Sequence, residues 1–399
     1  MGVSINVSAN VNKELYLATG FTFAYFTGLM MFQPILPLYI IDIGASKFEL
    51  GILMAMFPGI TILTRLPFGF IADRIGKWIT LLISLFMQLT AFFLYSIAPS
   101  PIYLYPITII YALSFASFGP VSIAMALDSA RVSKRGLAMG RYYTSIGASM
   151  ILGPLLTGFL ALTFNYKQIL FFATFLPMLC IIIFLTIYLR NKIEINTKKN
   201  LPPMIKNFFP LSSLFKIFKS RNIFFICYAQ ITYFVATGFF GTLFPIYAKE
   251  TLWFTTTTIS ILFAIRGLPN ALIRIPIGTL SDKIGRQIPL IFGYSLAFLA
   301  LFSIPFISDI IIIAILMAIY GVAWGIRTAP TAAFMGDNVK STDINLASAL
   351  IWLTSDIGLA SGSFIGGFFA TIMEIPTLLK ISSFSVFSAI LVLLFIKEN

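Results

Sequence analysis

The chain has 399 residues, of which 59% are hydrophobic and 10% charged, and its formal net charge is +13. A mean hydropathy of +0.96 excludes a soluble globular fold, in which apolar residues make up about half of the total. The chain contains no histidine, which excludes metal sites and proton relays that depend on imidazole. Cys180 and Cys227 lie within long apolar runs, where we expect small core residues rather than a disulfide.

Twelve apolar runs follow one another along the chain. Each is close to the roughly 20 residues that a helix needs to cross the hydrocarbon core. Their hydrophobicity is continuous rather than alternating, which indicates helices and not a membrane barrel. We therefore predict an all-α integral membrane protein with twelve transmembrane helices. The expected spans are 15–40, 48–70, 78–98, 101–127, 137–163, 167–189, 222–247, 255–278, 288–307, 310–335, 344–372 and 376–396.

The basic residues fix the expected topology. With both chain termini placed in the cytoplasm, most of the 27 Lys and Arg residues lie on the inner side. Those expected outside are Lys47, Lys167, Lys249 and Lys380. This is the positive-inside distribution of a multi-pass protein of the cell membrane, embedded in the lipid bilayer. Topology therefore explains the positive charge, and we expect no nucleic-acid partner.

A thirteen-residue string occurs twice in the chain, 209 positions apart, at 65–77 and at 274–286. Arg, Pro, Gly, Asp, Ile and Gly coincide in the two copies without a gap. Asp128 and Asp337, which close the fourth and tenth spans, also match at 209 positions, and spans 1 and 7 match at 208. A duplicated cytoplasmic turn predicts two six-helix halves of the same orientation, related by pseudo-symmetry.

The expected boundary between the halves is the long polar stretch 190–221, a cytoplasmic linker. The halves are then residues 1–189 and 222–399. Within the linker, the apolar residues of 211–218 fall on one helical face, which favours a short amphipathic helix on the inner leaflet. The alternative is a solvated linker that happens to contain apolar residues.

The string from Gly69 to Lys77 resembles the loop signature of the major facilitator superfamily, which follows span 2 and commonly recurs after span 8. This resemblance implies that Asp73 contacts the region near Asn345, and that Lys77 pairs with Asp128. Such contacts would hold the cytoplasmic side shut. The candidate gating residues are Gly69, Asp73, Arg74, Gly76, Lys77, Asp128, Gly278, Asp282, Lys283, Gly285, Arg286 and Asp337.

The glycines of this motif are also expected to have structural roles. Gly69 and Gly278 are expected to permit close helix approach, and Gly76 and Gly285 to allow a tight turn with unusual backbone angles. A plain positive-inside loop would explain the basic residues of the motif. It would not explain the duplicated Gly and Asp.

Span 5 contains Gly153, Pro154 and Gly158, which are similar to the family's span 5 signature associated with antiporters. The match is partial because Thr157 replaces a glycine, and the same residues also suit plain helix packing. Span 4 departs from the family pattern. Many proton-coupled members carry an arginine where this chain has Phe115, which puts proton coupling by that route in doubt.

Three charges lie deep within spans: Arg266, Arg327 and Asp356. A charge near the bilayer centre costs at least about 2.5 kcal/mol, so it normally faces a cavity or a partner. All three belong to the second half. We expect Asp356 to be a titratable or cation-binding site whose charge state an arginine sets; the alternative is a permanent ion pair that locks this half.

These observations predict a secondary active transporter working by alternating access, and we favour proton-coupled efflux of amphiphilic or drug-like compounds. The alternatives are an uptake symporter for a small organic anion and, remotely, a membrane sensor that does not transport. We expect a monomer that is not an enzyme and needs no cofactor or metal. The family implies a cavity lined by spans 1, 4, 7 and 10, with candidate wall residues Phe32, Gln33, Phe115, Gln230, Tyr233 and Trp324.

Overall fold

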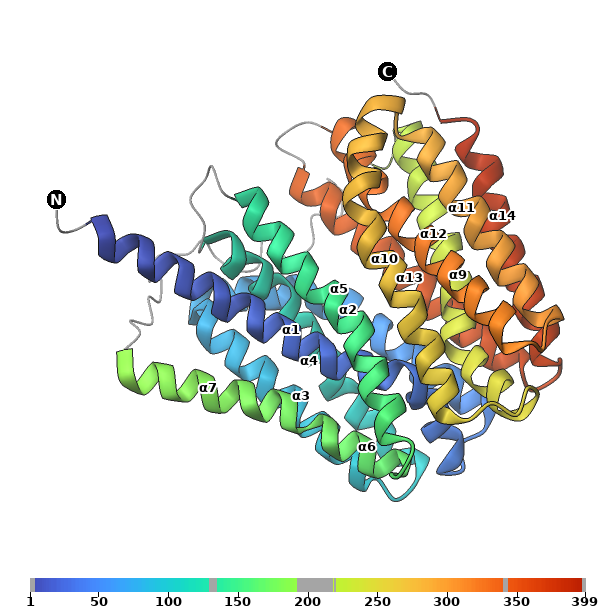
Figure 1. Cartoon of the computed structure of the whole chain (residues 1–399), viewed down its shortest axis with the longest axis horizontal. Coiled ribbons are helices and arrows are strands. Elements are labelled where there is room, and N and C mark those ends of the chain that lie inside the picture. The colour runs from blue at the N-terminus through green and yellow to red at the C-terminus, as the bar shows by residue number, and fades with distance from the viewer. Residues whose placement is uncertain (1–3, 129–134, 192–217, 219, 340–343, 397–399) are drawn as a thin grey trace. The chain divides into compact units, whose positions relative to one another are not determined.

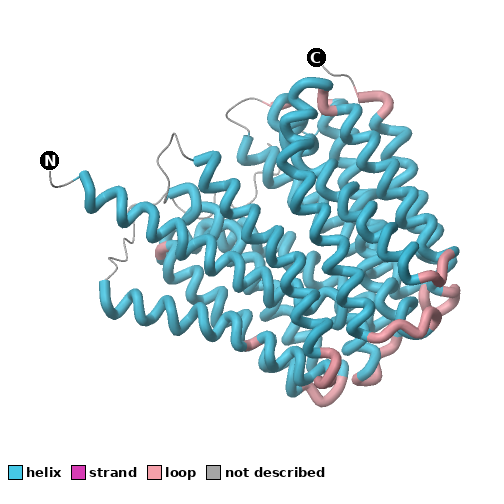
Figure 2. Tube along the Cα trace, viewed as in Figure 1, coloured by secondary structure: helices cyan, strands magenta, loops and turns pink. Residues whose placement is uncertain are grey.

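The computed structural model describes residues 4–128, 135–191, 218, 220–339 and 344–396. Within these residues the regular structure is entirely helical, as Figure 2 shows. Twelve of the described helical stretches are long and apolar enough to cross a membrane. This confirms the predicted all-α membrane protein with twelve spans. The amphipathic helix expected over 211–218 falls almost wholly outside the described residues.

The helices follow the predicted spans closely. In the first part of the chain they are α1 (Ser4–Asp42), α2 (Lys47–Ile75), α3 (Lys77–Ile97), η1 (Pro101–Tyr103), α4 (Leu104–Asp128), α5 (Arg135–Leu160), α6 (Tyr166–Ala173) and α7 (Phe175–Asn191). The rest are α9 (Arg221–Glu250), α10 (Thr256–Ile284), α11 (Gln287–Ser303), η3 (Ile304–Phe306), α12 (Ile310–Asp337), α13 (Ile344–Phe369) and α14 (Ile375–Leu393).

The sixth predicted span is one apolar run but two helices, α6 and α7. Pro177 has no backbone N–H, so it cannot bond to the carbonyl of Ala173 four residues earlier. The break falls at Thr174, directly after that carbonyl.

By its internal packing the chain divides into two compact units. Residues 1–32 and 63–208 form the first unit, and residues 33–62 and 209–399 form the second. The end of α1 and the beginning of α2 therefore belong to the second unit. The division into halves at 189 and 222, which the sequence repeat predicts, stays a prediction.

In the first unit, α3 packs against α4, α6 and α7, while α1 packs along α5. The α1–α5 contact is both polar and close. The Thr157 hydroxyl donates to the backbone oxygen of Met31 at 2.9 Å. A Cβ added to Gly153 would lie 2.6 Å from the Cβ of Met30, so only glycine fits at this crossing.

In the second unit, α9 packs against α13 and α14, and α12 packs against α10 and α11 (Figure 1). Three glycines four residues apart, Gly358, Gly362 and Gly366, line the face of α13 that meets α9. A Cβ added to Gly362 would lie 2.1 Å from the backbone oxygen of Val235. The backbones of α9 and α13 are therefore in direct contact.

The helix crossings at Gly153 and Gly362 lie at equivalent positions of the sequence repeat. Gly362 follows Gly153 by 209 positions, and Val235 follows Thr27 by 208. The backbone oxygen of Thr27 is 2.8 Å from the Cβ added to Gly153, which is the same contact in the first unit. The duplication in the sequence thus extends to the packing of span 1 on span 5 and of span 7 on span 11.

The beginning of α2 packs against α13 within the second unit. A Cβ added to Gly51 would lie 2.7 Å from the Cα of Gly367, so these two helices also cross through glycine. Next to the crossing, the rings of Phe48 and Phe364 have centroids 6.2 Å apart. The first turns of α2 are therefore held on α13 by close backbone approach and aromatic contact.

Candidate gating and intramembrane sites

The first copy of the repeated motif forms the turn between α2 and α3. Gly76 stands between the two helices with a φ of 96°, a conformation that suits glycine. Lys77 begins α3, and its ammonium group forms an ion pair with the Asp128 carboxylate at the end of α4. The structure thus contains the Lys77–Asp128 pair that the family resemblance implies.

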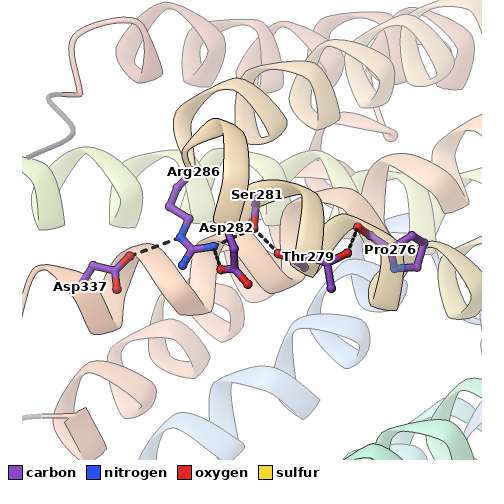
Figure 3. A network of polar contacts seen from close by, with 7 residues as sticks. Pro276, Thr279, Ser281, Asp282, Arg286 and Asp337 are labelled. Atoms are coloured by element: carbon purple, nitrogen blue, oxygen red, sulfur yellow. Dashed lines mark hydrogen bonds and ion pairs between the residues drawn. The ribbon is translucent and has the colours of Figure 1, made fainter.

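The second copy forms a larger network between α10 and α11 (Figure 3). The Arg286 guanidinium forms an ion pair with Asp282 and donates to Ser281 at 2.9 Å. Its Nε also lies 3.3 Å from the Asp337 carboxylate at the end of α12. Partial burial lowers the pKa of Arg286, but the hydrogen bonds and charges of Asp282 and Asp337 outweigh this and raise it. Arg286 therefore stays charged and joins three helices at this end of the second unit.

The two ion pairs are equivalent. In each copy, a basic residue after the second glycine pairs with an acid that lies 51 positions further along the chain. Side chains in both pairs are partly exposed to solvent, and ion pairs of this kind contribute little to stability. They are better suited to form and break than to hold the fold.

Other expectations for the motif have different outcomes. The contact of Asp73 with the region near Asn345 lies outside the described part of the structure, because neither side chain is described. The expected close approach at Gly69 and Gly278 is wrong for the described residues. A Cβ at Gly69 would meet no atom within 4 Å, and one at Gly278 only the Cβ of Ala329 at 4.0 Å. Gly69 instead borders a recess that Lys77 and residues of α4 also line.

Arg327 of α12 is buried in the second unit, with 2% of its surface exposed. Its guanidinium lies 3.8 Å from the ring centroid of Tyr233 and donates a hydrogen bond to the Gln230 amide oxygen. The equivalent residue 209 positions earlier is Phe118, whose ring stacks on Tyr25 at 3.7 Å. Arg327 thus occupies a stacking position that the repeat fills with phenylalanine in the first unit.

Arg266 of α10 is also 2% exposed. Its Nη2 donates to the amide oxygen of Gln33 at 2.9 Å. The rings of Phe263, Trp324 and Tyr320 surround the guanidinium, with centroids 4.7, 5.4 and 5.7 Å away. Guanidinium groups are stabilised by such ring faces, most of all when water is excluded.

Asp356 of α13 is 8% exposed, and its carboxylate accepts a hydrogen bond from Thr61 of α2 at 3.2 Å. In the described part of the chain, the hydrogen bonds and ion pairs of Arg266 and Arg327 do not include Asp356. The three intramembrane charges therefore do not form one ion-paired cluster. Among the described residues, the contacts of each arginine are with an amide oxygen and with aromatic side chains.

The predicted cavity residues separate into two groups. Phe32, Gln230 and Tyr233 are buried in the helix packing; the Phe32 ring, for example, stacks on Phe92 at 4.2 Å. Gln33, Phe115 and Trp324 are partly exposed and remain the better candidates for a wall. In span 5, Gly153 serves helix packing, as described above.

Sequence reasoning missed Asn270, Tyr320 and Thr61. A signal was available in the repeat, because Asn270 occupies the position of Thr61, 209 residues later, and Tyr320 that of Tyr111. Comparing the two halves in register would have marked a polar residue at the same place in spans 2 and 8 and a tyrosine at the same place in spans 4 and 10. Their contacts across helices could not have been found that way.

Twelve helices long and apolar enough to cross a membrane, with the same basic–acidic pair in both copies of a repeated turn, are typical of a multi-pass membrane protein of the transporter class. The family model of the Major Facilitator Superfamily matches residues 18–363 and 229–399. The chain belongs to the major facilitator superfamily.

Similar proteins were found both by sequence and by structure. An uncharacterized MFS-type transporter of Methanocaldococcus jannaschii, MJ1560, is 22% identical over 94% of this chain and 95% of its own length. The quinolone resistance protein NorA of Staphylococcus aureus is 26% identical over 43% of this chain and 44% of its own length.

Among solved structures, the peptide transporter POT in complex with sulfate has a TM-score of 0.76 at 13% identity, covering 96% of this chain and 93% of that one. A bacterial homolog of the human lysosomal transporter Spinster, solved in an inward-facing and unoccupied conformation, has a TM-score of 0.73 at 14% identity. It covers 97% of this chain and 95% of that one. At these identities the likeness supports the fold alone.

Proposed function

We propose that this transporter exports small amphiphilic compounds, neutral or weakly anionic, in exchange for protons. The two six-helix halves would give access to one side of the membrane and then the other. Membership of the superfamily supports transport of a small molecule. The partial likeness to NorA, a quinolone resistance protein, supports drug-like cargo and the outward direction.

The observation that carries the charge preference is the surplus of buried positive charge in the second unit. Arg266 and Arg327 each donate to a neutral amide oxygen rather than to a carboxylate. At an effective dielectric constant of about 20, a cation roughly 8 Å from an unneutralised guanidinium is repelled by about 2 kcal/mol. Permanent cations are therefore poor substrates in this proposal.

Asp356 is our candidate for the coupling proton. Its carboxylate is buried on a helix expected within the membrane, where the charged form is costly. The Thr61 hydroxyl, which also lies 2.8 Å from the Pro58 backbone oxygen, stabilises the charged form by donating to it, and protonation would weaken that hydrogen bond. A carboxylate in such a place can change charge during a transport cycle.

The remaining features of the proposal follow from the sequence. The distribution of basic residues supports a cell-membrane protein with both termini in the cytoplasm. Twelve spans in a single chain supply both halves, which supports a working monomer.

A second candidate function is uptake of a small organic anion, which the same two arginines favour. The two functions share a charge preference but differ in direction. Flux into and out of proteoliposomes under imposed pH gradients of either sign separates them, with matched cationic, neutral and anionic solutes. We expect solute export in exchange for protons, and we expect it to require the pH gradient. Neutral and anionic solutes should move at least about tenfold faster than permanent cations, because of the repulsion estimated above. Fastest movement of permanent cations, or flux that ignores the gradient, would overturn the proposal.

A further inference from the structure

Two hydrogen-bond donors lie buried without an acceptor, one turn apart on α10. Arg266 uses Nη2 on Gln33, while its Nε has no hydrogen-bond partner. Asn270 is fully buried, and its Nδ2 also lacks a partner. Residues four apart lie on the same face of a helix, so both donors belong to one stretch of α10.

The orientation of the Asn270 amide follows from its other contact. Its Oδ1 accepts a hydrogen bond from Arg274 Nε at 2.9 Å, one turn further along α10. The oxygen end of the amide is therefore committed to Arg274, and the Nδ2 end faces away from it. An interchange of the amide oxygen and nitrogen would put two donors against each other, which excludes that alternative.

This donor pair needs an anion. Buried donors in proteins are almost always paired, because leaving one without an acceptor forfeits the hydrogen bond it made to water. Arg266 adds a full positive charge that no described carboxylate neutralises. A carboxylate, with two oxygens that only accept, matches one charged and one neutral donor.

The surroundings of Arg266 also select the rest of the ligand. Trp324 and Gln33 are partly exposed, whereas Arg266 and Tyr320 are buried. Of the side chains around the Arg266 guanidinium, the Trp324 ring and the Gln33 amide are therefore the accessible ones, and the guanidinium itself is buried. A flat ring can lie against the exposed part of Trp324 while its acidic group reaches α10.

Arg327 does not provide an equivalent site. Both the Tyr233 ring against it and its amide partner Gln230 are buried. It also replaces Phe118, which stacks on the equivalent tyrosine, so packing accounts for its place. Both arginines leave Nε without a hydrogen-bond partner, and Thr331, one turn after Arg327 on α12, also has a buried hydroxyl without one. The two sites differ in access, because Trp324 and Gln33 beside Arg266 are partly exposed, whereas Tyr233 and Gln230 beside Arg327 are buried.

We propose that Arg266 and Asn270 bind the carboxylate of a planar aromatic acid whose ring stacks on Trp324. This assigns a substrate class to the site and rests on the proposed function, since it names the weakly anionic amphiphile that the transporter carries. All the residues involved lie in the second unit.

Binding can be measured without transport, through the fluorescence of Trp324 in the full-length protein in detergent. The chain has four tryptophans, so Trp78→Phe, Trp253→Phe and Trp352→Phe leave Trp324 as the reporter. The probes are 4-nitrobenzoate and its neutral match 4-nitrobenzamide, both of which quench tryptophan, with cyclohexanecarboxylate as a competitor that has the acid but no aromatic ring.

We expect 4-nitrobenzoate to bind about tenfold more tightly than the amide, because hydrogen bonds to charged groups are the stronger ones. As a competitor of 4-nitrobenzoate, cyclohexanecarboxylate should be about tenfold weaker than benzoate, the aromatic acid of similar size. Arg266→Gln and Asn270→Leu should each reduce the preference for acid over amide, with Arg266→Gln removing it. The matched control Arg327→Gln should keep it.

Equal affinity for acid and amide before any change at the site would overturn the inference, and this comparison needs no variant that could fail to fold. A preference that survives Arg266→Gln, or disappears in Arg327→Gln alone, would also overturn it. Failure of the proposed function is distinguishable. Acid-selective binding without proton-driven flux would refute the function and leave the site, whereas proton-driven flux without acid-selective binding would refute the site alone.

Discussion

The internal repeat lets single residues be compared in matched surroundings. Where the first unit stacks Phe118 on Tyr25, the second stacks Arg327 on Tyr233, with nearly the same separation of 3.7 and 3.8 Å. A planar guanidinium can take the place of a phenyl ring because it stacks on aromatic faces. A buried arginine is therefore no proof of a substrate site. The surroundings distinguish the two arginines, because Trp324 and Gln33 beside Arg266 are partly exposed, whereas Tyr233 and Gln230 beside Arg327 are buried.

Asp356→Asn tests the proposed coupling residue. If the Asp356 carboxylate carries the proton, its neutral amide should abolish gradient-driven accumulation while downhill exchange continues. Asparagine keeps an oxygen that accepts from Thr61, so folding should survive. The measurement compares uphill and downhill flux in proteoliposomes, with the yield of folded protein as control. Uphill transport at an unchanged rate would assign the proton to another group.

At the scale of helices, α13 depends on glycine for its contact with α9. Gly362→Ala would place a methyl group 2.1 Å from the Val235 backbone oxygen, so the helices must separate. We expect a destabilisation of about 1–3 kcal/mol, typical of overpacking. Thermal unfolding in detergent measures it. Gly241→Ala on α9 is the matched control because nothing lies within 4 Å there, and alanine should be neutral or slightly stabilising. Equal effects at the two sites would show that the close crossing does not matter.

The ion pair between the beginning of α3 and the end of α4 tests the motif. Lys77→Asp and Asp128→Lys each place two like charges together, and the double variant restores an opposite pair. Because the pair is partly exposed, we expect only about 0.2–1 kcal/mol of coupling. Transport should fall several-fold in each single variant and recover in the double one. The equivalent Arg286–Asp337 pair serves as a comparison, where recovery should be weaker because Arg286 also pairs with Asp282. Normal transport in both single variants would show that the Lys77–Asp128 pair has no role in gating.

At the scale of the whole molecule, the beginning of α2 packs with the second unit although its span belongs to the first repeat. Alternating access requires the two repeats to move against each other, so we expect the contact of Phe48 with Phe364 to open during transport. Phe48→Cys and Phe364→Cys, with the buried Cys180 and Cys227 replaced by alanine, can be joined by a short thiol-specific cross-linker that forms reducible disulfides.

The cross-linked protein should stop transporting and recover when the link is reduced. The matched control places the two cysteines at Phe298 and Phe387, whose rings lie 5.3 Å apart on α11 and α14 of the same repeat. Linking these helices should leave transport intact. Undiminished transport with α2 fixed to α13 would mean that this contact stays closed throughout the cycle.

The candidate site was only partly predictable. Arg266, Arg327 and Asp356 stand out in the sequence because charge is rare within apolar spans, and all three are indeed buried. Gln33 and Gln230 were expected as cavity-wall residues but not as partners of the arginines, and Thr61 did not stand out at all. Gln33 lies 233 positions from the arginine that it accepts from, and Thr61 lies 295 positions from Asp356. An uncharged polar residue in a span carries too little cost to be noticed alone, so only its contacts reveal its role.

The sequence by itself determined the class of fold, the number of spans and the repeat, while its resemblance to the family implied the pairing of Lys77 with Asp128. Each of these depends on properties that the chain carries locally: hydrophobic length, charge and a duplicated string. Only the tertiary structure decided which charges meet. It gave the two buried arginines amide partners in place of Asp356, and it left Gly69 open where close packing was expected. Such outcomes depend on how side chains from distant spans fill shared space, and that geometry is not written in any single stretch of sequence.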